Sequence, residues 1–498
     1  MKPNLPLTLY QAHQVRELDR RAIEHEGIAA IILMERAGQS ALTHLQAQWP
    51  QARRITVLCG RGNNGGDGYV LARLAYLSGY TVKVLQLGDT TQLTGAARLA
   101  YVAMTQLGLS VHPFVAAELS DAEVIVDALL GTGLDRPVTA AYRQAIEAVL
   151  RLQSIPVLAM DIPSGLDADT GKVLGLAMVA QVTVTFIGLK RGLFTAQGPA
   201  HCGSVYFEGL QVPATIYHAM APTVARLTYS TVKTALPKRS QTAHKGQFGH
   251  VLIIGGDQGM IGALQLAAEA AARVGAGKIS VATRATHAPL LSLTRPEIMS
   301  HGIETAEQLL ALLAQATVVA LGPGLGQSPW AQRLFETVMQ TDKALIIDAD
   351  GLNLLAQKPT RLGHSILTPH PGEAGRLLQQ STAEIQADRF AAVQALQQRF
   401  GGIVVLKGAG TVIIDDYNQL SLCHGGNPGM ACGGMGDVLT GVIAGFVAQG
   451  YSLSTAAQLG VCVHAQAGDQ AALEGERGLL PSDLLMRLRY VVNPHSHT

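Results

Sequence analysis

The stretch "NPGMACGGMGDVLTG", from Asn427 to Gly441, places a single carboxylate, Asp437, behind a run of glycines and directly before apolar residues. Glycines at 433, 434 and 436 permit positive φ and leave backbone N–H groups uncovered. The apolar residues predict a helix, whose N-terminus carries partial positive charge. The stretch is typical of an anion site. Asp437 is a candidate general base beside a transferring phosphoryl group, with an ordinary N-cap as the alternative.

Other glycine-rich turns in the same half support this interpretation. "VVLKGAGT" puts Lys407 and two glycines directly after a predicted strand, which suits a nucleotide phosphate. "LTPHPGE" holds His370 between two prolines, a stiff presentation suited to hydrogen bonding. "LGPGLG" and "GDQGMIGA" expose more backbone at strand ends. Each alone is most often an ordinary turn, but together they favour a ligand site.

The organisation of the chain predicts two α/β domains. The 498 residues exceed the usual size of one domain. In both halves, short β-branched runs alternate with glycine-rich turns and helical patterns, which predicts mostly parallel sheets with ligands at the carboxyl ends of the strands. The segment 212–244 is rich in Pro, Ser and Thr and has no period. We therefore expect domains at 1–222 and 232–494, joined there.

The first half carries a second set of polar strand ends. "GRGNNGGDG" follows the predicted strand "ITVLC" and differs from the G-x-G-x-x-G fingerprint by its two Asn and its Asp. Asp127, Asp161 and Ser164 end or follow later strands of the same predicted sheet. Any one of them is most simply an Asx-turn or a cap. As a set they predict a second ligand site.

Seven motifs of the second half are "HKGQFGHVLIIGG", "GALQLAAEAAARVGAG", "LGPGLG", "DADGLN", "TPHPGE", "LKGAGT" and "GMACGGMGDVLTG". Together they resemble the motifs of the ribokinase-like ADP-dependent NAD(P)H-hydrate dehydratases, over most of residues 235 to 492. The resemblance implies a C-terminal ribokinase-like α/β domain that removes water from hydrated NADH and NADPH, driven by ADP with Mg²⁺. It implies hydrate contacts at Ala263, Gly326, His370 and Asp437. It implies nucleotide contacts at Lys407, Gly408, Ala409, Gly410, Thr411 and Gly436.

A mechanism follows for Asp437 as the base. The carboxylate would activate the hydroxyl of the hydrated ring to attack the terminal phosphate of the nucleotide. The resulting phosphate ester is a good leaving group, which the ring nitrogen can expel. The glycine turn would supply amides where negative charge develops, and Mg²⁺ would be bound mainly through phosphates and water.

The first half, over about residues 10 to 215, resembles the NAD(P)H-hydrate epimerases, from "VRELDRRAIEHEGI" and "LMERAG" to "QGPAHCGSVYF". The resemblance implies a Rossmann-like three-layer αβα sandwich and a K⁺ ion held by Asn64, Asp127 and Ser164. All-oxygen ligation suits such a hard cation. It implies hydrate contacts at Asn63, Asn64, Gly65, Gly66, Asp67, Gly131, Thr132, Gly133, Leu134, Asp135, Arg136, Pro137 and Asp161.

Asp161 is the best candidate for proton transfer while the hydroxyl-bearing carbon loses and regains its configuration. Lys190 is a second candidate, although a surface lysine beside a strand end is the commoner outcome. The two halves would then form one pathway, in which the first interconverts the R and S hydrates and the second dehydrates the S form.

Composition narrows the partners and the compartment. A formal net charge of +1 gives no bulk basic face and argues against nucleic acid. Five scattered cysteines without a C-x-x-C pair favour neither a disulfide framework nor zinc, which fits a reducing cytoplasm. No stretch approaches the roughly 20 apolar residues of a membrane span, and we see no signal peptide. The family resemblance implies a homo-oligomer.

Two alternatives remain at this point. Ribokinase-like domains mostly phosphorylate alcohols, so the second half alone also fits a small-molecule kinase, with the first half as a nucleotide-binding or assembly module; the ordered occurrence of "NNGGDG", "VDALLGTGLDRP" and "MDIPSGLD" argues against a kinase alone. In the second alternative the first half is a catalytically silent binding or assembly module, and the intact carboxylates of Asp127 and Asp161 argue against it. Whether ADP or ATP is the working nucleotide is left open.

Overall fold

The computed structural model describes residues 5–218, 220 and 224–494. The chain divides into two compact units, Met1–Ala225 and Arg226–Thr498. The boundary between them falls within the segment 212–244, where the sequence predicts the junction. The predicted limit at residue 222 lies outside the described residues. No helix within the described ranges combines the length and apolar character that crossing a membrane requires.

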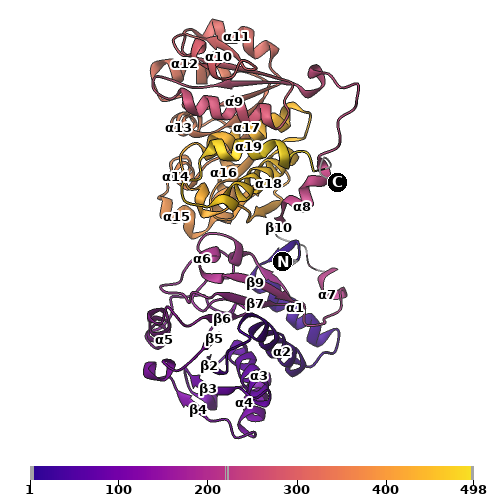
Figure 1. Cartoon of the computed structure of the whole chain (residues 1–498), viewed down its shortest axis with the longest axis vertical. Coiled ribbons are helices and arrows are strands. Elements are labelled where there is room, and N and C mark those ends of the chain that lie inside the picture. The colour runs from indigo at the N-terminus through magenta and orange to yellow at the C-terminus, as the bar shows by residue number, and fades with distance from the viewer. Residues whose placement is uncertain (1–4, 219, 221–223, 495–498) are drawn as a thin grey trace. The chain divides into compact units, whose positions relative to one another are not determined.

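The N-terminal unit is built on a seven-stranded parallel sheet (Figure 1). Its strand order is β4 (Val111–Pro113), β3 (Thr81–Gln86), β2 (Arg54–Cys59), β5 (Val124–Ala128), β6 (Val157–Met160), β7 (Val182–Phe186) and β9 (Ser204–Glu208). Further elements are β1 (Thr8–Tyr10), α1 (Ala12–Glu24), α2 (Ala30–Gln48), α3 (Asn63–Leu77), α4 (Gly95–Thr105), α5 (Ala140–Arg151), β8 (Leu189–Lys190), α6 (Gly198–Cys202) and α7 (Thr215–His218). β10 (Val224–Leu227) begins at the end of this unit.

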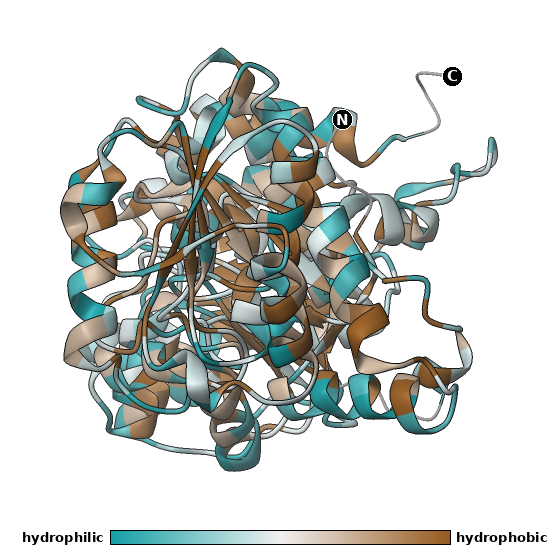
Figure 2. Cartoon of the chain, turned by 90° about the horizontal axis from the view of Figure 1, so that it is seen from below, coloured by the Kyte–Doolittle hydropathy of each residue, from teal (hydrophilic) through white to brown (hydrophobic). Residues whose placement is uncertain are grey.

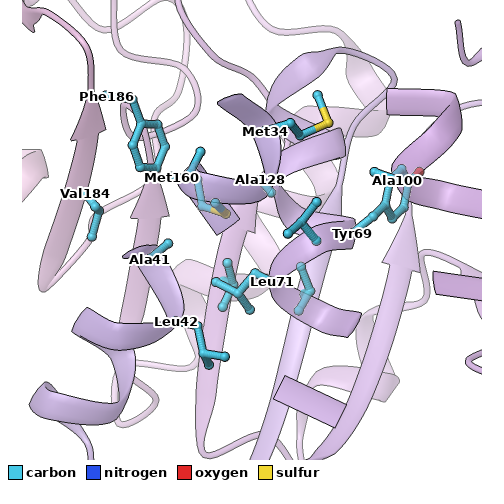
Figure 3. Packing of buried hydrophobic residues seen from close by; sticks show 14 of the residues in the cluster. Met34, Ala41, Leu42, Tyr69, Leu71, Ala100, Ala128, Met160, Val184 and Phe186 are labelled. Atoms are coloured by element: carbon cyan, nitrogen blue, oxygen red, sulfur yellow. The ribbon is translucent and has the colours of Figure 1, made fainter. Parts of the chain in front are cut away.

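Alternation along the strands separates two apolar layers. In β2, Val57 and Cys59 join the cluster formed with α2, α3 and α4, of which Figure 3 shows part. Leu58 between them joins a different cluster, with Ile146 and Val149 of α5. The sheet is therefore covered by helices on both faces, and the predicted three-layer αβα sandwich is confirmed.

The topology fixes where a ligand can bind in this unit. The chain runs outward from β2 through β3 to β4, then returns to place β5 on the other side of β2. Cys59 at the end of β2 pairs with Ala128 at the end of β5, so both strands end at the same level. The loops after β2 and β5 diverge at this switch point and leave a crevice between them.

The C-terminal unit repeats this construction. Its strand order is β13 (Met299–Gly302), β12 (Lys278–Thr283), β11 (His250–Ile254), β14 (Val318–Leu321), β15 (Ala344–Ile347), β16 (Ser365–Leu367), β17 (Ile403–Leu406), β18 (Thr411–Ile414) and β19 (Leu420–Cys423). Pairing is parallel as far as β17 and antiparallel from β17 to β19. The switch point lies between β11 and β14.

The helices of this unit are mostly amphipathic. They are α8 (Tyr229–Val232), α9 (Ile261–Arg273), α10 (Ala288–Thr294), α11 (Ala306–Gln315), α12 (Pro329–Val338), α13 (Ala349–Gln357), α14 (Pro371–Leu378), α15 (Thr382–Ala387), α16 (Arg389–Phe400), α17 (Met435–Ala448), α18 (Leu453–Ala471) and α19 (Pro481–Val491). Figure 2 colours the whole chain by hydropathy and shows helices that carry both hydrophilic and hydrophobic residues. α9, α17 and α18 share one apolar cluster with the sheet.

Some glycines of α17 serve packing rather than ligand binding. A Cβ on Gly441 would lie 2.0 Å from the carbonyl oxygen of Ala267 in α9, and one on Gly445 would lie 2.4 Å from Val274 Cγ2. Glycine at these positions lets α17 approach α9 closely. This contact fixes the helix N-terminus that carries Asp437.

Candidate active sites

A cavity of about 770 Å³ lies in the N-terminal unit and is lined by loops that follow the strands. Its lining includes Asn63, Asn64, Asp67, residues 131–137 and Asp161. Gly65 and Gly66, in the first turn of α3, pack closely against neighbouring residues. A Cβ on Gly65 would lie 2.1 Å from the Gly60 carbonyl oxygen, and one on Gly66 would lie 2.6 Å from Met34 Cε.

Asp161 is held at this cavity by an unusual backbone and by several donors. Its φ is 66°, in the left-handed region that non-glycine residues rarely adopt. Non-glycine residues with such a backbone are often found at functional sites. Its Oδ1 accepts from the Phe186 N–H and from Thr185 Oγ1, both at 3.3 Å, and from the Lys190 ammonium.

Lys190 is not the surface lysine that we expected. Its side chain is completely buried. The ammonium donates to Asp161, to Thr185 Oγ1 at 2.9 Å and to the Phe186 carbonyl at 3.1 Å. The expectation was wrong because sequence spacing alone does not show that Lys190, in β8, points toward Asp161. In that position the buried ammonium finds its hydrogen-bond partners.

The same cavity contains Asp19 of α1, which our sequence reasoning missed. Burial, with the negative charge of Asp161, raises the pKa of Asp19 to about 7 against the opposing effect of Lys190. Burial and the charges of Asp161 and Asp19 raise the pKa of Asp67 well above its ordinary value. A signal was available, because Asp19 stands four residues after the buried Val15, along the apolar side of the helix.

The three predicted K⁺ ligands lie around the loop that follows β5. Asp127 accepts from Ser164 Oγ at 2.6 Å and from the Ser164 N–H at 2.8 Å, and Ser164 Oγ accepts from the Leu130 N–H at 2.8 Å. Burial raises the pKa of Asp127 to about 6, against these hydrogen bonds. Asn64 lies beside Gly131, and its side-chain oxygen and nitrogen are buried without a hydrogen-bond partner. Buried amides are normally satisfied, so an oxygen-seeking cation fits this position.

In the C-terminal unit, Asp437 lies in the first turn of α17, behind Gly434 with a φ of 94°. Burial raises the pKa of Asp437 to about 7, with Asp348 adding to the rise and Lys407 opposing it. A carboxyl group with this pKa exchanges its proton at neutral pH, as a general base requires.

Lys407 is already paired. Its ammonium lies 2.6 Å from Asp348 Oδ1 and 3.9 Å from Glu373 Oε2. Thr440 donates to the other oxygen of Asp348 at 2.7 Å. A Cβ on Gly436 would lie 3.1 Å from the ammonium nitrogen, so the lysine lies beside the glycine turn. Sequence reasoning missed both acidic partners, although Asp348 follows β15 directly and thus lies at a strand end.

The loop Lys407–Thr411 is braced from beneath by a residue that sequence reasoning also missed. Arg389 is completely buried, and its Nη2 donates to the carbonyls of Leu406, Lys407 and Gly410 at 3.0, 3.2 and 3.3 Å. With these carbonyls held, the turn has a fixed conformation in which Gly408 and Gly410 have φ of 133° and 66°.

His370 begins α14 and forms a reciprocal capping box with Glu373. The ring Nδ1 accepts from the Gly372 N–H at 3.0 Å, and the backbone N–H of His370 donates to Glu373 Oε2 at 2.7 Å. Burial and then the charge of Lys407 lower the pKa of the imidazole. Because Nδ1 accepts a hydrogen bond, the neutral ring carries its proton on Nε2, which lies 3.4 Å from Glu373 Oε1. Half of the side chain is exposed.

Ala263 lies in α9, after β11, and Gly326 lies in the loop after β14, so the two residues flank the switch point between these strands. Ala263 lies beside Gly324, where a Cβ would be 3.3 Å from Ala263 Cβ. Gly326 has a φ of 68°, and its N–H donates to Asp350 Oδ2 at 2.8 Å. The structure thus brings Asp437, Gly436 and Lys407 together, while Ala263 and Gly326 lie after the two strands of the switch point.

Comparisons with known proteins cover both units. A family model described as NAD(P)H-hydrate dehydratase matches residues 251–489, and one described as YjeF-related protein N-terminus matches residues 30–192. The bifunctional NAD(P)H-hydrate repair enzyme Nnr of Coxiella burnetii is 52% identical over 487 residues, 98% of this chain and 99% of that protein. The protein of the same name from Vibrio cholerae is 41% identical over 490 residues, with 98% and 99% covered.

Among solved structures, a ribokinase-like superfamily protein from Enterococcus faecalis matches with a TM-score of 0.51 and 30% identity. The match covers 56% of this chain and 99% of that one. The ribokinase-like fold predicted for the second half is thereby confirmed.

Proposed function

We propose roles for individual residues from the premise that this chain belongs to the family of bifunctional NAD(P)H-hydrate repair enzymes. The enzyme interconverts the R and S hydrates of NADH and NADPH and dehydrates the S form to NAD(P)H, driven by ADP. We assign the epimerase to residues 1–222 and the dehydratase to residues 232–494. A simple alcohol kinase leaves the full-length similarity to repair enzymes unexplained.

The observation that carries the dehydratase assignment is Asp437 at the N-terminus of α17 with a pKa of about 7. We assign Asp437 as the base that takes the proton of the ring hydroxyl while this oxygen attacks the terminal phosphate of the nucleotide. The phosphorylated hydroxyl then leaves as the ring nitrogen supplies its electron pair. Ala263, Gly326 and His370 are proposed to hold the hydrate, with His370 Nε2–H as a hydrogen-bond donor.

The nucleotide is assigned to Lys407, Gly408, Ala409, Gly410, Thr411 and Gly436. The Lys407 ammonium has three donors, and its bond to Asp348 leaves capacity for a phosphate oxygen. The rigid turn above Arg389 offers backbone amides to the remaining oxygens. Mg²⁺, when bound with the nucleotide, would offset phosphate charge, and the nearby carboxylates of Asp348 and Glu373 suit a hard cation and its water.

For the epimerase, Asp161 is the proposed proton-transfer group, in a cavity large enough for the hydrated ring and part of the dinucleotide. Asn63, Asn64, Asp67 and residues 131–137 are proposed to bind the hydrate. Asn64, Asp127 and Ser164 are proposed to hold K⁺, which would add positive charge beside the ring. The unsatisfied amide of Asn64 supports this donor set.

We also propose a homo-oligomer in the cytoplasm. The five cysteines are free thiols, and four of them are buried, which fits a reducing compartment. Analytical ultracentrifugation of the full chain would test the assembly.

The test uses purified S-form NADH hydrate and the recovery of NADH absorbance. We expect recovery with Mg²⁺ and ADP, compared directly with ATP, and a loss of about 10²-fold or more in Asp437→Asn. The R form alone should then be consumed by the parent, but not by Asp161→Ala, whose dehydration of the S form should be unchanged. No recovery with either nucleotide would overturn the dehydratase assignment. Consumption of the R form by Asp161→Ala would overturn the role of that residue.

A further inference from the structure

One wall of the epimerase cavity comes from an element that none of the strand-end motifs includes. Arg16, Asp19 and Ile23 of α1 all line the cavity, and their spacing places them on one side of the helix. Arg16 donates to the Thr132 carbonyl at 3.2 Å, which ties this helix to the loop after β5. Asp19 is thus presented to the same space as Asp161, from a different element.

The buried Lys190 does not pair with every carboxyl group that lines this cavity. Lys190 uses all three of its N–H groups, on Asp161, Thr185 and the Phe186 carbonyl. Asp19 and Asp67 therefore form no hydrogen bond with that ammonium, and each adds a carboxyl group to a partly buried space. The charges of Asp161 and Lys190 act on Asp19, and Asp19 in turn raises the pKa of Asp67 and of Tyr217. The arginines that line the cavity are Arg16, on α1 itself, Arg61 and Arg136.

These surroundings place the carboxyl groups of Asp19 and Asp161 in different environments. With a pKa of about 7, Asp19 exchanges its proton in the neutral range, because burial and Asp161 disfavour its charge more than Lys190 favours it. Asp161 differs in having a direct ammonium partner and a backbone N–H donor. Paired groups in unlike environments are the usual arrangement of an acid and a base in one site.

Inversion at one carbon requires chemistry on both faces of the ring. If the hydroxyl leaves from one face, water must add to the other, and each event moves a proton. We propose that Asp19 is a catalytic acid–base residue of the epimerase, acting with Asp161 on the hydroxyl-bearing carbon of the hydrate. This assignment rests on the epimerase activity proposed for the N-terminal unit.

In the R to S direction, Asp19 gives its proton to the ring hydroxyl as the carbon–oxygen bond breaks and water leaves. The electron pair of the ring nitrogen forms a carbon–nitrogen double bond, so the ring becomes a cation. Water then adds to the opposite face, one of its protons passes to the Asp161 carboxylate, and nitrogen regains its pair. One water leaves, one is added, and one proton moves from Asp19 to Asp161; exchange with solvent restores both groups.

The test compares Asp19→Asn with Glu17→Gln in the full chain. Glu17 lies on the same helix, and its carboxylate pairs with Arg20 and Arg21 outside the cavity. Conversion of R to S NADH hydrate is followed by chromatography without nucleotide, so that dehydration does not interfere. We expect Asp19→Asn to lower kcat by about 10²-fold or more with KM within threefold, and Glu17→Gln to match the parent.

Two further readouts separate catalysis from a structural role. In the parent, kcat should fall as the pH rises through about 7, because Asp19 loses the proton that it donates, and Asp19→Asn should lack this fall. Asp19→Glu should restore part of kcat. In H₂¹⁸O, the parent should incorporate one solvent oxygen for each inversion, a measurement that needs no variant to fold.

Several outcomes would overturn the proposal. They are retention of the original oxygen, a kcat for Asp19→Asn within threefold of the parent, and a rise in KM alone. A parent without any R to S conversion would instead overturn the epimerase function itself, so the two failures are distinguishable.

Discussion

Replacing Asp437 by Asn is expected to remove dehydration and at the same time to stabilise the protein. The pKa of this carboxyl rises from an ordinary 3.8 to about 7, because burial, assisted by Asp348, outweighs the attraction of Lys407. Each pH unit corresponds to about 1.4 kcal/mol, so keeping this group ionised above pH 7 costs the folded state about 4 kcal/mol at most. Relaxation of the site reduces the realised value.

The sign of the pH dependence follows from linkage. The folded state binds this proton more tightly than the unfolded chain, so stability from this group is complete below about pH 4. It declines as the pH rises from about 4 to 7 and is lost above 7. Asparagine does not ionise and avoids the loss. We therefore expect Asp437→Asn to exceed the parent in free energy of unfolding by about 2 to 4 kcal/mol at pH 8, and to match it at pH 4.

The assay is urea unfolding of the full chain at both pH values, beside NADH recovery from the S hydrate. Asp416→Asn, an exposed position in the turn after β18, makes the same chemical change outside the site and should alter neither property. If Asp437→Asn were no more stable than the parent at pH 8, or equally stabilised at pH 4, the reasoning would fail. Such a result would mean that the folded state does not raise the pKa of the Asp437 carboxyl group.

Further predictions concern both units. In the parent, kcat for dehydration should fall about tenfold per pH unit below pH 7 as Asp437 gains its proton, measured by initial rates from pH 5 to 8. Lys190→Met should destabilise the N-terminal unit by about 3 kcal/mol, seen in thermal unfolding, because Asp161 loses its buried partner. Arg389→Met should raise KM for ADP about tenfold with a smaller change in kcat, since two loop carbonyls and that of Leu406 at the end of β17 lose their donor. Asn64→Leu should abolish activation of epimerisation by K⁺ without loss of stability in its absence, since the orphaned amide is removed; a retained K⁺ response would contradict the donor set.

The sequence predicted the fold from patterns that act locally. Buried β-branched runs, glycine turns and helical periods determine parallel sheets almost independently of the partners that each side chain finds. The positions of Asn64, Asp127, Asp161 and Asp437 at strand or helix ends followed from the same rule, because ligands bind where parallel strands end.

What the sequence did not show was the pairing of charges. Lys190 is separated by 29 residues from Asp161, and Lys407 by 59 from Asp348. No periodicity connects residues at such distances. Arg389 was missed for the same reason, since an arginine at the start of a helix is ordinary until the loop that it braces is placed above it.

The two units solve one electrostatic problem in the same way. Each pairs a lysine with a buried or partly buried aspartate, Lys190 with Asp161 and Lys407 with Asp348, and leaves another carboxyl group nearby with a pKa of about 7, Asp19 or Asp437. An unpaired ammonium would draw that neighbour's pKa down and make it too weak a base. Because the partner aspartate compensates most of the lysine's positive charge, burial has the larger effect on the pKa of the neighbouring carboxyl group. A lysine–aspartate pair without net charge beside a buried acid therefore tunes the pKa of a proton-transfer group to neutral pH. Replacing both members of the pair by uncharged residues should shift that pKa less than removing either member alone.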